Sequence, residues 1–327
     1  MLPPTIEAIR AADARIRPYA LRTPLIENAK LNERLGGRVL LKLETLQRVG
    51  AFKFRGAYNK ISQIDKALHP GGVVASSSGN HAQGVADASA LMGLPAVIVM
   101  PSDAPAMKIA RTRRLGAEVV LYDREREDRM VIAERLQTER GAVMVHPFDD
   151  PDIIAGQGTA GLEIVEQLPA MAAVPDLVLV PCSGGGLLSG IAIAIHSRFP
   201  DCQVMSAEPE GFDDFARSLE SGKRESNTRK SGSICDALLS EMPGEITFAA
   251  CTQQAVRGVA VSEAEVRAAV RYAFEELKLV VEPGGAVAFA ALLSGKAPLN
   301  GRTAVVVLSG GNIDPVLFAE ILSGDPS

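Results

Sequence analysis

From residue 71 onward, short apolar runs alternate with helical segments that end on glycine. A first series of apolar runs covers residues 73–77, 96–100, 117–122 and 142–146, and a second covers 176–180, 203–208 and 303–311. Strands that are apolar along their whole length are typical of parallel sheets with helices on both faces. The pattern predicts an α/β protein with two such units, near 71–147 and from about 151 onward, preceded by an N-terminal arm.

The charge balance argues against a nucleic-acid partner. The chain of 327 residues has 34 basic and 39 acidic side chains and a net charge of −5, whereas nucleic-acid binding requires a clustered basic surface. The densest basic segment, "IARTRRLG" (109–116), has apolar residues at helical spacing and reads as a solvated helix face.

The cysteines and the N-terminus indicate in which cellular compartment the protein resides. The four cysteines form no C-x-x-C pair and no disulfide framework. The N-terminus does not resemble a signal peptide, and no apolar run is long enough to span a bilayer. We therefore expect a cytoplasmic protein without a membrane segment.

Three glycine-rich loops follow strands of the predicted sheets, and parallel sheets bind ligands at the carboxyl ends of their strands. In "SSSGNHAQG" (76–84), hydroxyl groups precede a helix, which suits a carboxylate. A plain helix cap by Ser78 or Asn80 would also explain that loop. In "LSGGNID" (308–314), Ser309 ends a strand and can present its hydroxyl to a ligand, with a simple turn as the alternative.

The loop "PCSGGGLLSG" (181–190) suits a lone phosphate. Successive glycines allow backbone N–H groups to converge on an anion at the positive end of a helix. The loop lacks the G-K-[ST] ending of a nucleotide P-loop, so a phosphomonoester fits better than a triphosphate. Tight packing of a helix on a strand is the alternative explanation for these glycines.

One glycine pattern does not indicate a cofactor. "GQGTAG" (156–161) matches the dinucleotide-binding fingerprint, but that fingerprint must follow a strand directly. The preceding segment, "HPFDDPDIIA" (146–155), contains two prolines and three aspartates. We expect these glycines to permit close helix packing.

Lys53 stands between Phe52 and Phe54 in a chain with only 4% aromatic residues. Burial disfavours the charged form of lysine and lowers its pKa. A neutral amine is a nucleophile that can form a Schiff base. Combined with a lone phosphate site, such a lysine predicts pyridoxal 5′-phosphate (PLP), with the aldehyde on Lys53 and the phosphate on residues 183–187. A surface lysine whose stem packs on the rings is the alternative.

The motifs around these residues occur in the order seen in fold-type II PLP-dependent enzymes. From residue 22 to residue 314 the chain resembles this family, and most closely its threonine/serine dehydratases and serine racemases, including the 3-hydroxyaspartate dehydratase branch. The motifs are "AFKFRGA" (51–57), "SSSGNHAQG", "AGQGT" (155–159), "PCSGGGLLSGIA", "AEP" (207–209), "VEPGGA" (281–286) and "LSGGNID".

The resemblance implies a two-domain fold similar to the β subunit of tryptophan synthase, in which each domain is a mostly parallel sheet flanked by helices. Residues 1–66 and 151–327 would form a large PLP-binding domain, and residues 67–150 a small substrate-binding domain. Relatives are commonly homodimers, and we expect the same here.

The resemblance also implies the roles of individual residues. Lys53 would hold the cofactor as a Schiff base, Phe52 would lie beside its ring, and Asn80 would hydrogen-bond its 3′-oxygen. Ser309 would face the pyridine nitrogen, with Glu282 near the same part of the ring. The phosphate would be held by Ser183, Gly184, Gly185, Gly186 and Leu187. The substrate carboxylate would be held by Ser77, Ser78, Asn80 and His81.

By the same resemblance the protein is a dehydratase, or ammonia-lyase, that removes water from serine, threonine or 3-hydroxyaspartate to give a keto acid and ammonia. Lys53 would remove the Cα proton. Ser78 is shared with serine racemases and 3-hydroxyaspartate dehydratases, and would be a second catalytic residue on the opposite face of the ring. An amino-acid racemase that acts on serine or aspartate is therefore the alternative function.

The segment "AEPEGFDD" (207–214) resembles the divalent-metal site of that branch. The ligands would be the carboxylates of Glu208 and Asp214 and the carbonyl oxygen of Phe212, and oxygen ligands suit Mg²⁺ or Ca²⁺. A solvated acidic loop is the alternative.

Overall fold

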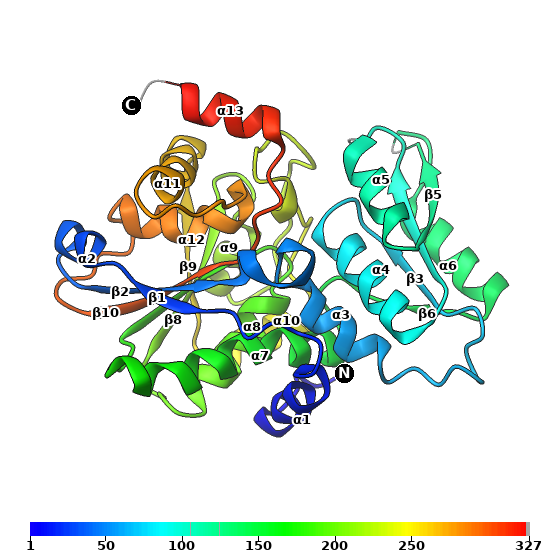
Figure 1. Ribbon diagram of the computed structural model, residues 1–327, viewed down its shortest axis with the longest axis horizontal. Helices are drawn as coiled ribbons and strands as arrows, with labels where there is room; N and C mark the ends of the chain where they lie inside the picture. The colour runs from blue at the N-terminus through cyan, green and yellow to red at the C-terminus, as the bar shows by residue number, and fades with distance from the viewer. Residues whose placement is uncertain (105, 124, 325–327) are drawn as a thin grey trace.

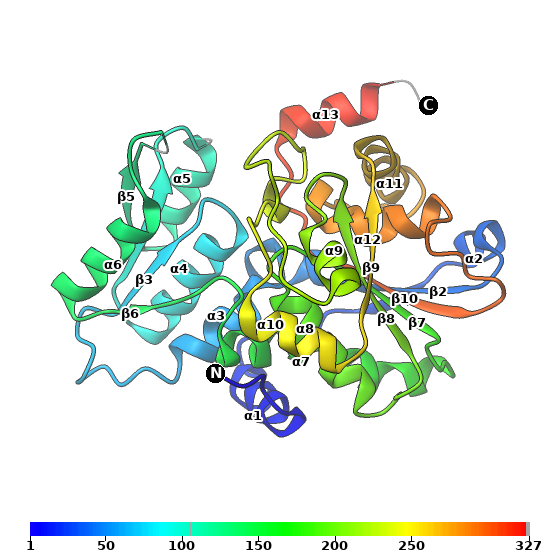
Figure 2. The same cartoon turned by 180° about the vertical axis from the view of Figure 1, so that it is seen from behind.

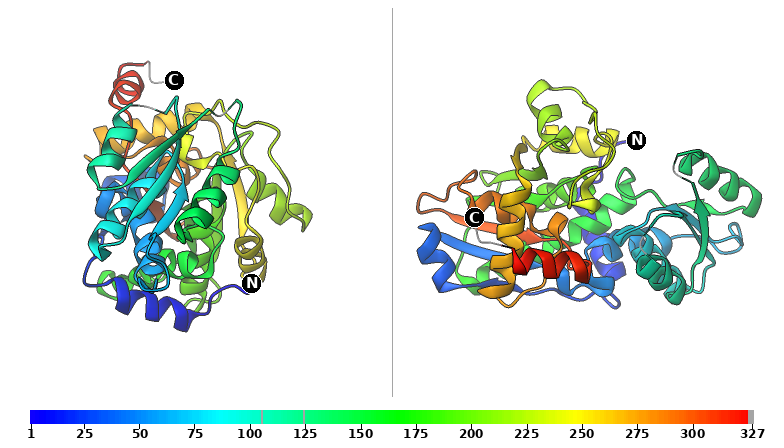
Figure 3. Two further views of the ribbon diagram at one scale, coloured as in Figure 1. Left: turned by 90° about the vertical axis from the view of Figure 1, so that its right-hand side faces the viewer. Right: turned by 90° about the horizontal axis from the view of Figure 1, so that it is seen from above.

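The computed structural model describes residues 1–104, 106–123 and 125–324. These residues form two sheets, one with six strands and one with four. Figure 1 shows the sheets in two α/β bodies, with helix α3 (Lys53–Ile61) between them. The view from above in Figure 3 shows the same two bodies. The predicted α/β fold with mostly parallel sheets is confirmed.

The six-stranded sheet has the order β1-β2-β10-β7-β8-β9. β1 runs antiparallel to β2, and all other neighbours are parallel. The strands are β1 (Leu25–Glu27), β2 (Arg38–Leu43), β7 (Leu177–Pro181), β8 (Gln203–Pro209), β9 (Arg257–Val261) and β10 (Thr303–Leu308). The sheet thus joins the N-terminal segment to the C-terminal half of the chain.

Alternate residues of these strands face opposite layers of helices. Leu177 and Leu179 of β7 pack with α12, whereas Val178 and Val180 pack with α8, as the two-residue period of a strand requires. Figure 1 and Figure 2 show these layers on the two faces of the sheet. One layer is α7 (Pro151–Gln167) and α8 (Gly186–His196), and the other is α11 (Glu263–Glu275) and α12 (Pro283–Leu293).

The four-stranded sheet has the order β5-β4-β3-β6 and is parallel throughout. Ala75 and Ile98 pack in the core formed with α3 and α4, whereas Val74 and Val99 pack with α6. The strands are β3 (Val73–Ser76), β4 (Ala96–Pro101), β5 (Glu118–Tyr122) and β6 (Val143–Met144). The helices are α4 (Asn80–Met92), α5 (Ala106–Arg114) and α6 (Arg129–Arg140).

The remaining helices connect or cover these layers. They are α1 (Ile6–Ile16), α2 (Ala29–Leu35), α9 (Asp214–Ser221), α10 (Glu245–Gln253) and α13 (Pro315–Ser323), with 3₁₀ turns η1 (Glu44–Leu46), η2 (Arg48–Gly50), η3 (Leu168–Met171) and η4 (Asp236–Leu238). In the described part of the chain, no helix is long and apolar enough to cross a membrane.

The glycines of residues 156–161 serve close helix packing, as predicted. A Cβ atom on Gly158 would lie 3.0 Å from the carbonyl oxygen of Gly190 on α8. A Cβ atom on Gly156 would lie 2.6 Å from the Cα atom of Gly56 on α3. The pattern therefore allows α7 to touch both α8 and α3, and it lies inside a helix rather than in a ligand-binding turn.

Candidate active site

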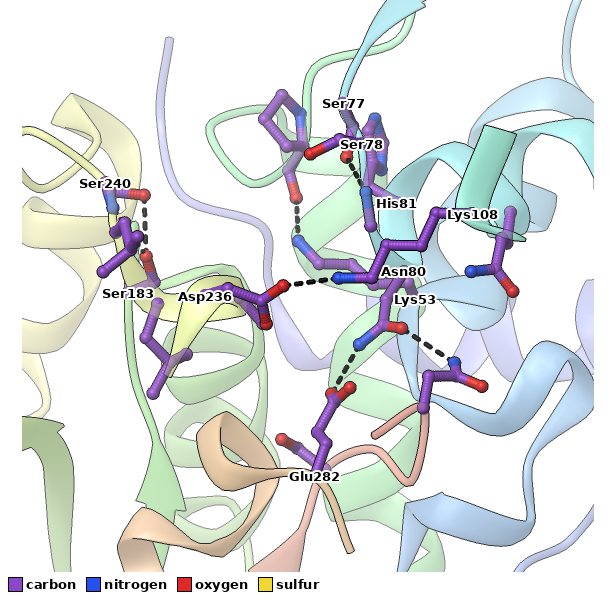
Figure 4. A pocket seen from close by; sticks show the side chains of 18 of the residues that line it. Lys53, Ser77, Ser78, Asn80, His81, Lys108, Ser183, Asp236, Ser240 and Glu282 are labelled. Carbon is purple, nitrogen blue, oxygen red and sulfur yellow. Dashed lines mark hydrogen bonds and ion pairs between the residues drawn. The ribbon is translucent and has the colours of Figure 1, made fainter. Parts of the chain in front are cut away.

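A cavity of about 730 Å³ opens between the two sheets, where the three glycine-rich loops of the sequence analysis meet. Figure 4 shows side chains from both bodies pointing into it. The cavity is lined by all residues predicted to bind cofactor or substrate: Phe52, Lys53, Ser77, Ser78, Asn80, His81, Ser183, Gly184, Gly185, Gly186, Leu187, Glu282 and Ser309.

Lys53 begins α3 and extends into this cavity. Its Nζ donates to the carbonyl oxygen of Pro147 at 2.7 Å and lies 5.2 Å from the centre of the Phe52 ring. Burial lowers the pKa of Lys53 to about 8, because desolvation disfavours the ammonium form. A substantial fraction of the amine is therefore neutral near pH 8, as attack on an aldehyde requires.

The loop before α8 has the geometry of an anion site. Gly185 caps α8 with a φ of 93°, and no side chain caps the helix. The first backbone N–H groups of a helix have no partner within it, and these open into the cavity at the positive end of α8. A Cβ atom would lie 2.4 Å from the Phe148 ring at Gly184, and 2.3 Å from the Phe215 ring at Gly185. Both positions therefore require glycine.

Two hydroxyl groups extend this anion site. Ser183 Oγ donates to Ser240 Oγ at 2.7 Å, and the backbone N–H of Ser240 donates back to Ser183 Oγ at 3.2 Å (Figure 4). Ser240 also lines the cavity. Ser240 was not predicted from the sequence, since nothing in its local sequence places it beside a loop that lies 57 residues earlier.

The start of α4 forms a second anion site. Gly79 is the N-terminal cap, and no side chain caps the helix, so the alternative of a cap by Ser78 or Asn80 is wrong. Ser77 Oγ instead accepts from the backbone N–H of Gly79 at 3.2 Å. The first amides of α4 remain for a ligand, and a carboxylate is stabilised at such an N-terminus.

His81 lies in the first turn of α4 and is 3% exposed. Its Nε2 is 3.0 Å from the carbonyl oxygen of Val145, and because a carbonyl only accepts, Nε2 carries the proton. Among the described residues, Nδ1 has no hydrogen-bond partner. Burial, with the charge of Lys53, lowers the pKa of His81 to about 3. The neutral ring in this tautomer has no proton on Nδ1, so any contribution to carboxylate binding comes from the backbone N–H of His81.

Asn80 and Glu282 are in direct contact. Asn80 Nδ2 donates to Glu282 Oε1 at 2.6 Å (Figure 4). Burial and the charge of Asp236 raise the pKa of Glu282 to about 7. Ser309 is 4% exposed, and its carbonyl oxygen accepts from the backbone N–H of Phe52 at 3.1 Å. That bond ties the loop after β10 to the start of α3.

Cationic side chains form part of the cavity wall, and none of them was predicted from the sequence to be a site residue. They are Lys108, Arg111, Arg114, Arg129 and Lys230. The interpretation of 109–116 as a solvated helix face is wrong for Arg111, which donates to Asn312 Oδ1 at 2.8 Å. The spacing of the arginines indicates a helix, but tertiary packing alone decides which of them reaches the cavity.

Comparison with known proteins decides the family. Residues 16–310 match the family model described as pyridoxal-phosphate dependent enzyme. The chain belongs to this family. The family predicted from the ordered motifs is thus confirmed.

Several proteins of this PLP-dependent family are similar to the chain over nearly its whole length. An L-threo-3-hydroxyaspartate ammonia-lyase from Saccharomyces cerevisiae is 41% identical, over 99% of this chain and 98% of its own. An L-threonine ammonia-lyase from Thermotoga maritima is 42% identical, over 98% of this chain and 78% of its own. The structure of maize serine racemase matches with a TM-score of 0.91 at 37% identity, and covers 97% of this chain and 96% of that one.

The residues present fit the cofactor of the PLP-dependent family. PLP requires an amine for its aldehyde and an anion site for its phosphate, and Lys53 and the α8 N-terminus provide both in one cavity. The cavity volume of about 730 Å³ lies within the roughly 300–1,000 Å³ that is typical of small-molecule sites.

The residues predicted to bind a metal lie outside this cavity, where β8 ends and α9 begins. Glu208 and Asp214 are buried, so the alternative of a solvated acidic loop is wrong for them. Glu208 accepts from the backbone N–H groups of Phe215 at 3.0 Å and Ala216 at 2.7 Å. Asp214 Oδ2 has no partner among the described residues.

The buried carboxylates of Glu208 and Asp214 are crowded together, and both have a raised pKa. Burial and the charge of Asp214 raise the pKa of Glu208 well above its usual range, and burial raises the pKa of Asp214 to about 7. Within residues 1–104, 106–123 and 125–324, no three His, Cys, Asp or Glu side chains cluster to hold a metal. A cation here would therefore depend on the carbonyl oxygen of Phe212 as well.

Proposed function

We propose that this PLP-dependent enzyme is an ammonia-lyase that removes water from a β-hydroxy amino acid, and that it prefers 3-hydroxyaspartate to serine and threonine. The observation that carries the proposal is the placement of Lys53, two helix N-termini and a cationic wall around one cavity. Relatives named as threonine and 3-hydroxyaspartate ammonia-lyases support the reaction class.

Each part of the cavity has one task in this reaction. Bound PLP supplies an aldehyde that condenses with amines and a ring that withdraws electrons from the substrate Cα. The α8 N-terminus, residues 183–187, would hold the phosphate, Asn80 would donate to the 3′-oxygen, and Phe52 would lie beside the ring. The α4 N-terminus with Ser77 and Ser78 holds the substrate carboxylate. Lys53 would take the Cα proton of the substrate, which its lowered pKa permits near pH 8.

Ser309 offers the pyridine nitrogen a neutral hydroxyl. A hydroxyl would stabilise a protonated ring less than a carboxylate does, and this would favour loss of the β-hydroxyl. Water leaves in the elimination and is taken up again when the product is hydrolysed. The net products are therefore a keto acid and ammonia.

A dicarboxylate substrate is supported by the cationic wall. Arg129, the first residue of α6, is one of the cations that line the cavity. A β-carboxylate beside the reacting carbon can pair with a guanidinium through charge-assisted hydrogen bonds, whereas the methyl group of threonine cannot.

Arg129→Met tests the substrate assignment. We expect kcat/KM for 3-hydroxyaspartate to fall about 10- to 100-fold, in line with the roughly 1.5–3 kcal/mol of a hydrogen bond to a charged group, and kcat/KM for serine to change less. The readout is keto acid release from both enantiomers of serine and threonine and from the 3-hydroxyaspartate diastereomers. Arg126→Met is the matched control, because Arg126 is exposed just before α6. A wild-type preference for threonine, or an equal fall for every substrate, would contradict the assignment.

Ser78 favours a second candidate, racemisation of serine or aspartate. Its hydroxyl lines the cavity in the loop before α4, and racemisation requires a proton-transfer group opposite Lys53. The likeness to maize serine racemase supports this candidate. After incubation with L-serine or L-aspartate in heavy water, a D-isomer that carries deuterium at Cα and is lost in Ser78→Ala would establish racemisation. Absence of the D-isomer would exclude it.

We propose that Mg²⁺ is coordinated by the carboxylates of Glu208 and Asp214 and by the carbonyl oxygen of Phe212. The unpartnered Oδ2 of Asp214 supports this site, since a divalent cation would neutralise two buried carboxylates. Mg²⁺ should raise the midpoint of thermal unfolding of the wild type, and Asp214→Asn should abolish the rise. Equal midpoints in Mg²⁺ and in EDTA would contradict the metal site.

We further propose the division into a large domain, residues 1–66 and 151–327, and a small domain, residues 67–150; residues 325–327 lie outside the described part. The pairing of β2 with β10 supports joining the first residues to the last. α3 packs in the core of the four-stranded sheet, so the boundary at residue 66 separates α3 from part of its packing. Limited proteolysis near residue 66 tests this boundary.

A homodimer and a cytoplasmic location complete the proposal. Leu21 and Leu46 are both 52% exposed, and Gln47 holds the backbone of Leu21 through two hydrogen bonds. The two exposed leucines therefore lie in neighbouring segments of the chain, which supports contact with a second copy of the chain. All four cysteines are free, as suits a reducing compartment. Light scattering that reports a monomer would contradict the dimer.

A further inference from the structure

Four side chains form a continuous hydrogen-bonded chain from α5 to the cavity. Arg111 Nη1 donates to Asn312 Oδ1 at 2.8 Å, and Asn312 Nδ2 donates to Asn80 Oδ1 at 2.8 Å. Asn80 Nδ2 then donates to Glu282 Oε1 at 2.6 Å (Figure 4). The four residues come from α5, the loop after β10, the start of α4 and the residue before α12. This series of hydrogen bonds therefore links the two sheets across the site predicted for the cofactor ring.

The chemistry of arginine fixes which atoms donate and which accept along this series of hydrogen bonds. A guanidinium has only donors and stays protonated, so the Asn312 atom that faces Arg111 must be the acceptor Oδ1. Asn312 Nδ2 then donates to Asn80 Oδ1, which turns Asn80 Nδ2 toward Glu282. A carboxylate accepts, so the chain ends without conflict. The Val49 carbonyl oxygen, which accepts from Asn312 Nδ2 at 2.8 Å, favours the same orientation, so Arg111 secures the Asn312 amide together with Val49.

The backbone before Lys53 depends on the same two residues. Val49 has a φ of 56° and a ψ of 10°, a left-handed conformation that a β-branched residue rarely adopts. Its carbonyl oxygen accepts from Asn312 Nδ2 at 2.8 Å and from Arg111 Nη2 at 3.4 Å. Strained backbone persists only where its surroundings hold it. Arg111 and Asn312 thus hold the segment that leads into α3.

We propose that Arg111 is a positioning residue, which orients the Asn80 amide and the Glu282 carboxyl toward the cofactor ring and holds the backbone before Lys53. The inference rests on the proposed function, because it assumes that the ring lies between Lys53, Asn80 and Glu282. Arg111 acts through Asn312 and contacts neither Lys53 nor Glu282 in the hydrogen bonds described. A purely structural tie between α5 and the loop after β10 is the competing explanation.

Arg111→Met in the full-length protein tests the proposal, with Arg113→Met as the matched control. Arg113 is exposed on the same helix and does not line the cavity. The first readout is the Kd of PLP for the apoprotein, from cofactor fluorescence. We expect Kd to rise about tenfold in Arg111→Met, as loss of one strong hydrogen bond predicts. Arg111→Lys should recover part of this, since a lysine keeps a donor.

The second readout is the pH titration of the bound cofactor's absorbance. Glu282 is faced by Asp236 and Lys108 through their charges, and by Asn80 and the backbone N–H of Asn312 through hydrogen bonds. The hydrogen bond from Asn80 favours the ionised carboxylate, so misdirecting it should move the midpoint to higher pH in Arg111→Met. A merely structural tie would leave this midpoint where the wild type has it.

A double-mutant cycle keeps the test informative even if Arg111→Met destabilises the fold. Asn312→Ala breaks the chain one link closer to the cavity, so Arg111→Met should add little to it in the double variant. Wild-type Kd and titration midpoint in Arg111→Met, or fully additive effects with Asn312→Ala, would overturn the inference alone. A wild-type protein that takes up no PLP would overturn the proposed function and this inference with it.

Discussion

The reactive residue is Lys53, and burial destabilises the charged form of its amine. Lys53 is desolvated in the cavity, and its Nζ has a backbone carbonyl oxygen as its hydrogen-bond partner. The amine is thereby set nearer to neutral pH than an exposed lysine, whose pKa is about 10.4. This shift, rather than a neighbouring base, prepares the amine for an aldehyde.

Uptake of PLP by the apoprotein should therefore depend on pH through Lys53. With a pKa of about 8, the neutral fraction falls about tenfold for each pH unit below 8, so the rate constant should rise up to pH 8 and level off above it. Rapid-mixing absorbance between pH 6.5 and pH 10 measures this. A rate that is flat over the range, or that still rises steeply at pH 10, would contradict the lowered pKa.

Gly185→Ala should remove the phosphate site. The new Cβ atom would lie 2.3 Å from the Phe215 ring, at a φ of 93°. Gly116→Ala is the matched control, because Gly116 also has a φ of 93° but has open space around its Cβ position. We expect Gly185→Ala to bind PLP more than about 100-fold more weakly, as loss of several charge-assisted hydrogen bonds implies. Equal PLP affinity in the two variants would refute the assignment of this loop.

Local sequence was enough to predict some residues of the site and not others. Lys53, Gly185 and Ser309 stand within motifs whose neighbours explain them, and all three line the cavity. Arg111 and Asn312 meet across 201 residues, and only the packing of α5 brings them together. The tautomer of His81 could not be predicted from the sequence either, because it depends on the carbonyl oxygen of Val145.

At the scale of elements, a buried cluster of charges fixes the start of α3. Arg55, two residues after Lys53, is fully buried and donates to Glu44 at 2.8 Å and to Glu163 at 2.7 Å. Lys42 of β2 donates to Glu163 at 2.6 Å. Two cations and two carboxylates thus join β2, η1, α3 and α7. The cluster keeps the helix that carries the reactive lysine in one orientation.

Arg55→Met should destabilise the whole protein, because it leaves two buried carboxylates short of a cation. We expect the free energy of unfolding to fall by about 3–5 kcal/mol, the range for breaking a buried ion pair. Urea unfolding of the apoprotein measures it, with the exposed Arg113→Met as reference. A loss below about 1 kcal/mol, which is typical of surface pairs, would show that the cluster does not anchor α3.

Short apolar runs predicted β3, β4, β5, β6, β7, β8 and β10, and the prediction missed β1, β2 and β9. β2 carries Lys42, which interrupts its apolar run and is buried only because Glu163 neutralises it. β9 begins with an arginine and a glycine, and its pairing with β8 is what makes it a strand.

At the scale of the molecule, the site exists because two sheets face each other. The cavity takes its anion sites from α4 on one sheet and α8 on the other. α5 reaches across it through Lys108 to Asp236 (Figure 4) and through Arg111 to Asn312. Sequence analysis predicted two α/β units. It could not predict how they face each other, since that arrangement is set by α3 and α7 packing between them.

The central claim is that Lys53 binds the cofactor aldehyde covalently. Borohydride reduction of the PLP-loaded protein, followed by proteolysis and mass spectrometry, tests it most directly, because reduction fixes the lysine–cofactor bond. We predict that the pyridoxyl group is found on the peptide that contains Lys53 and that Lys53→Ala carries none. A pyridoxyl group on another lysine, such as Lys108 or Lys230, or no modified peptide at all, would contradict the account.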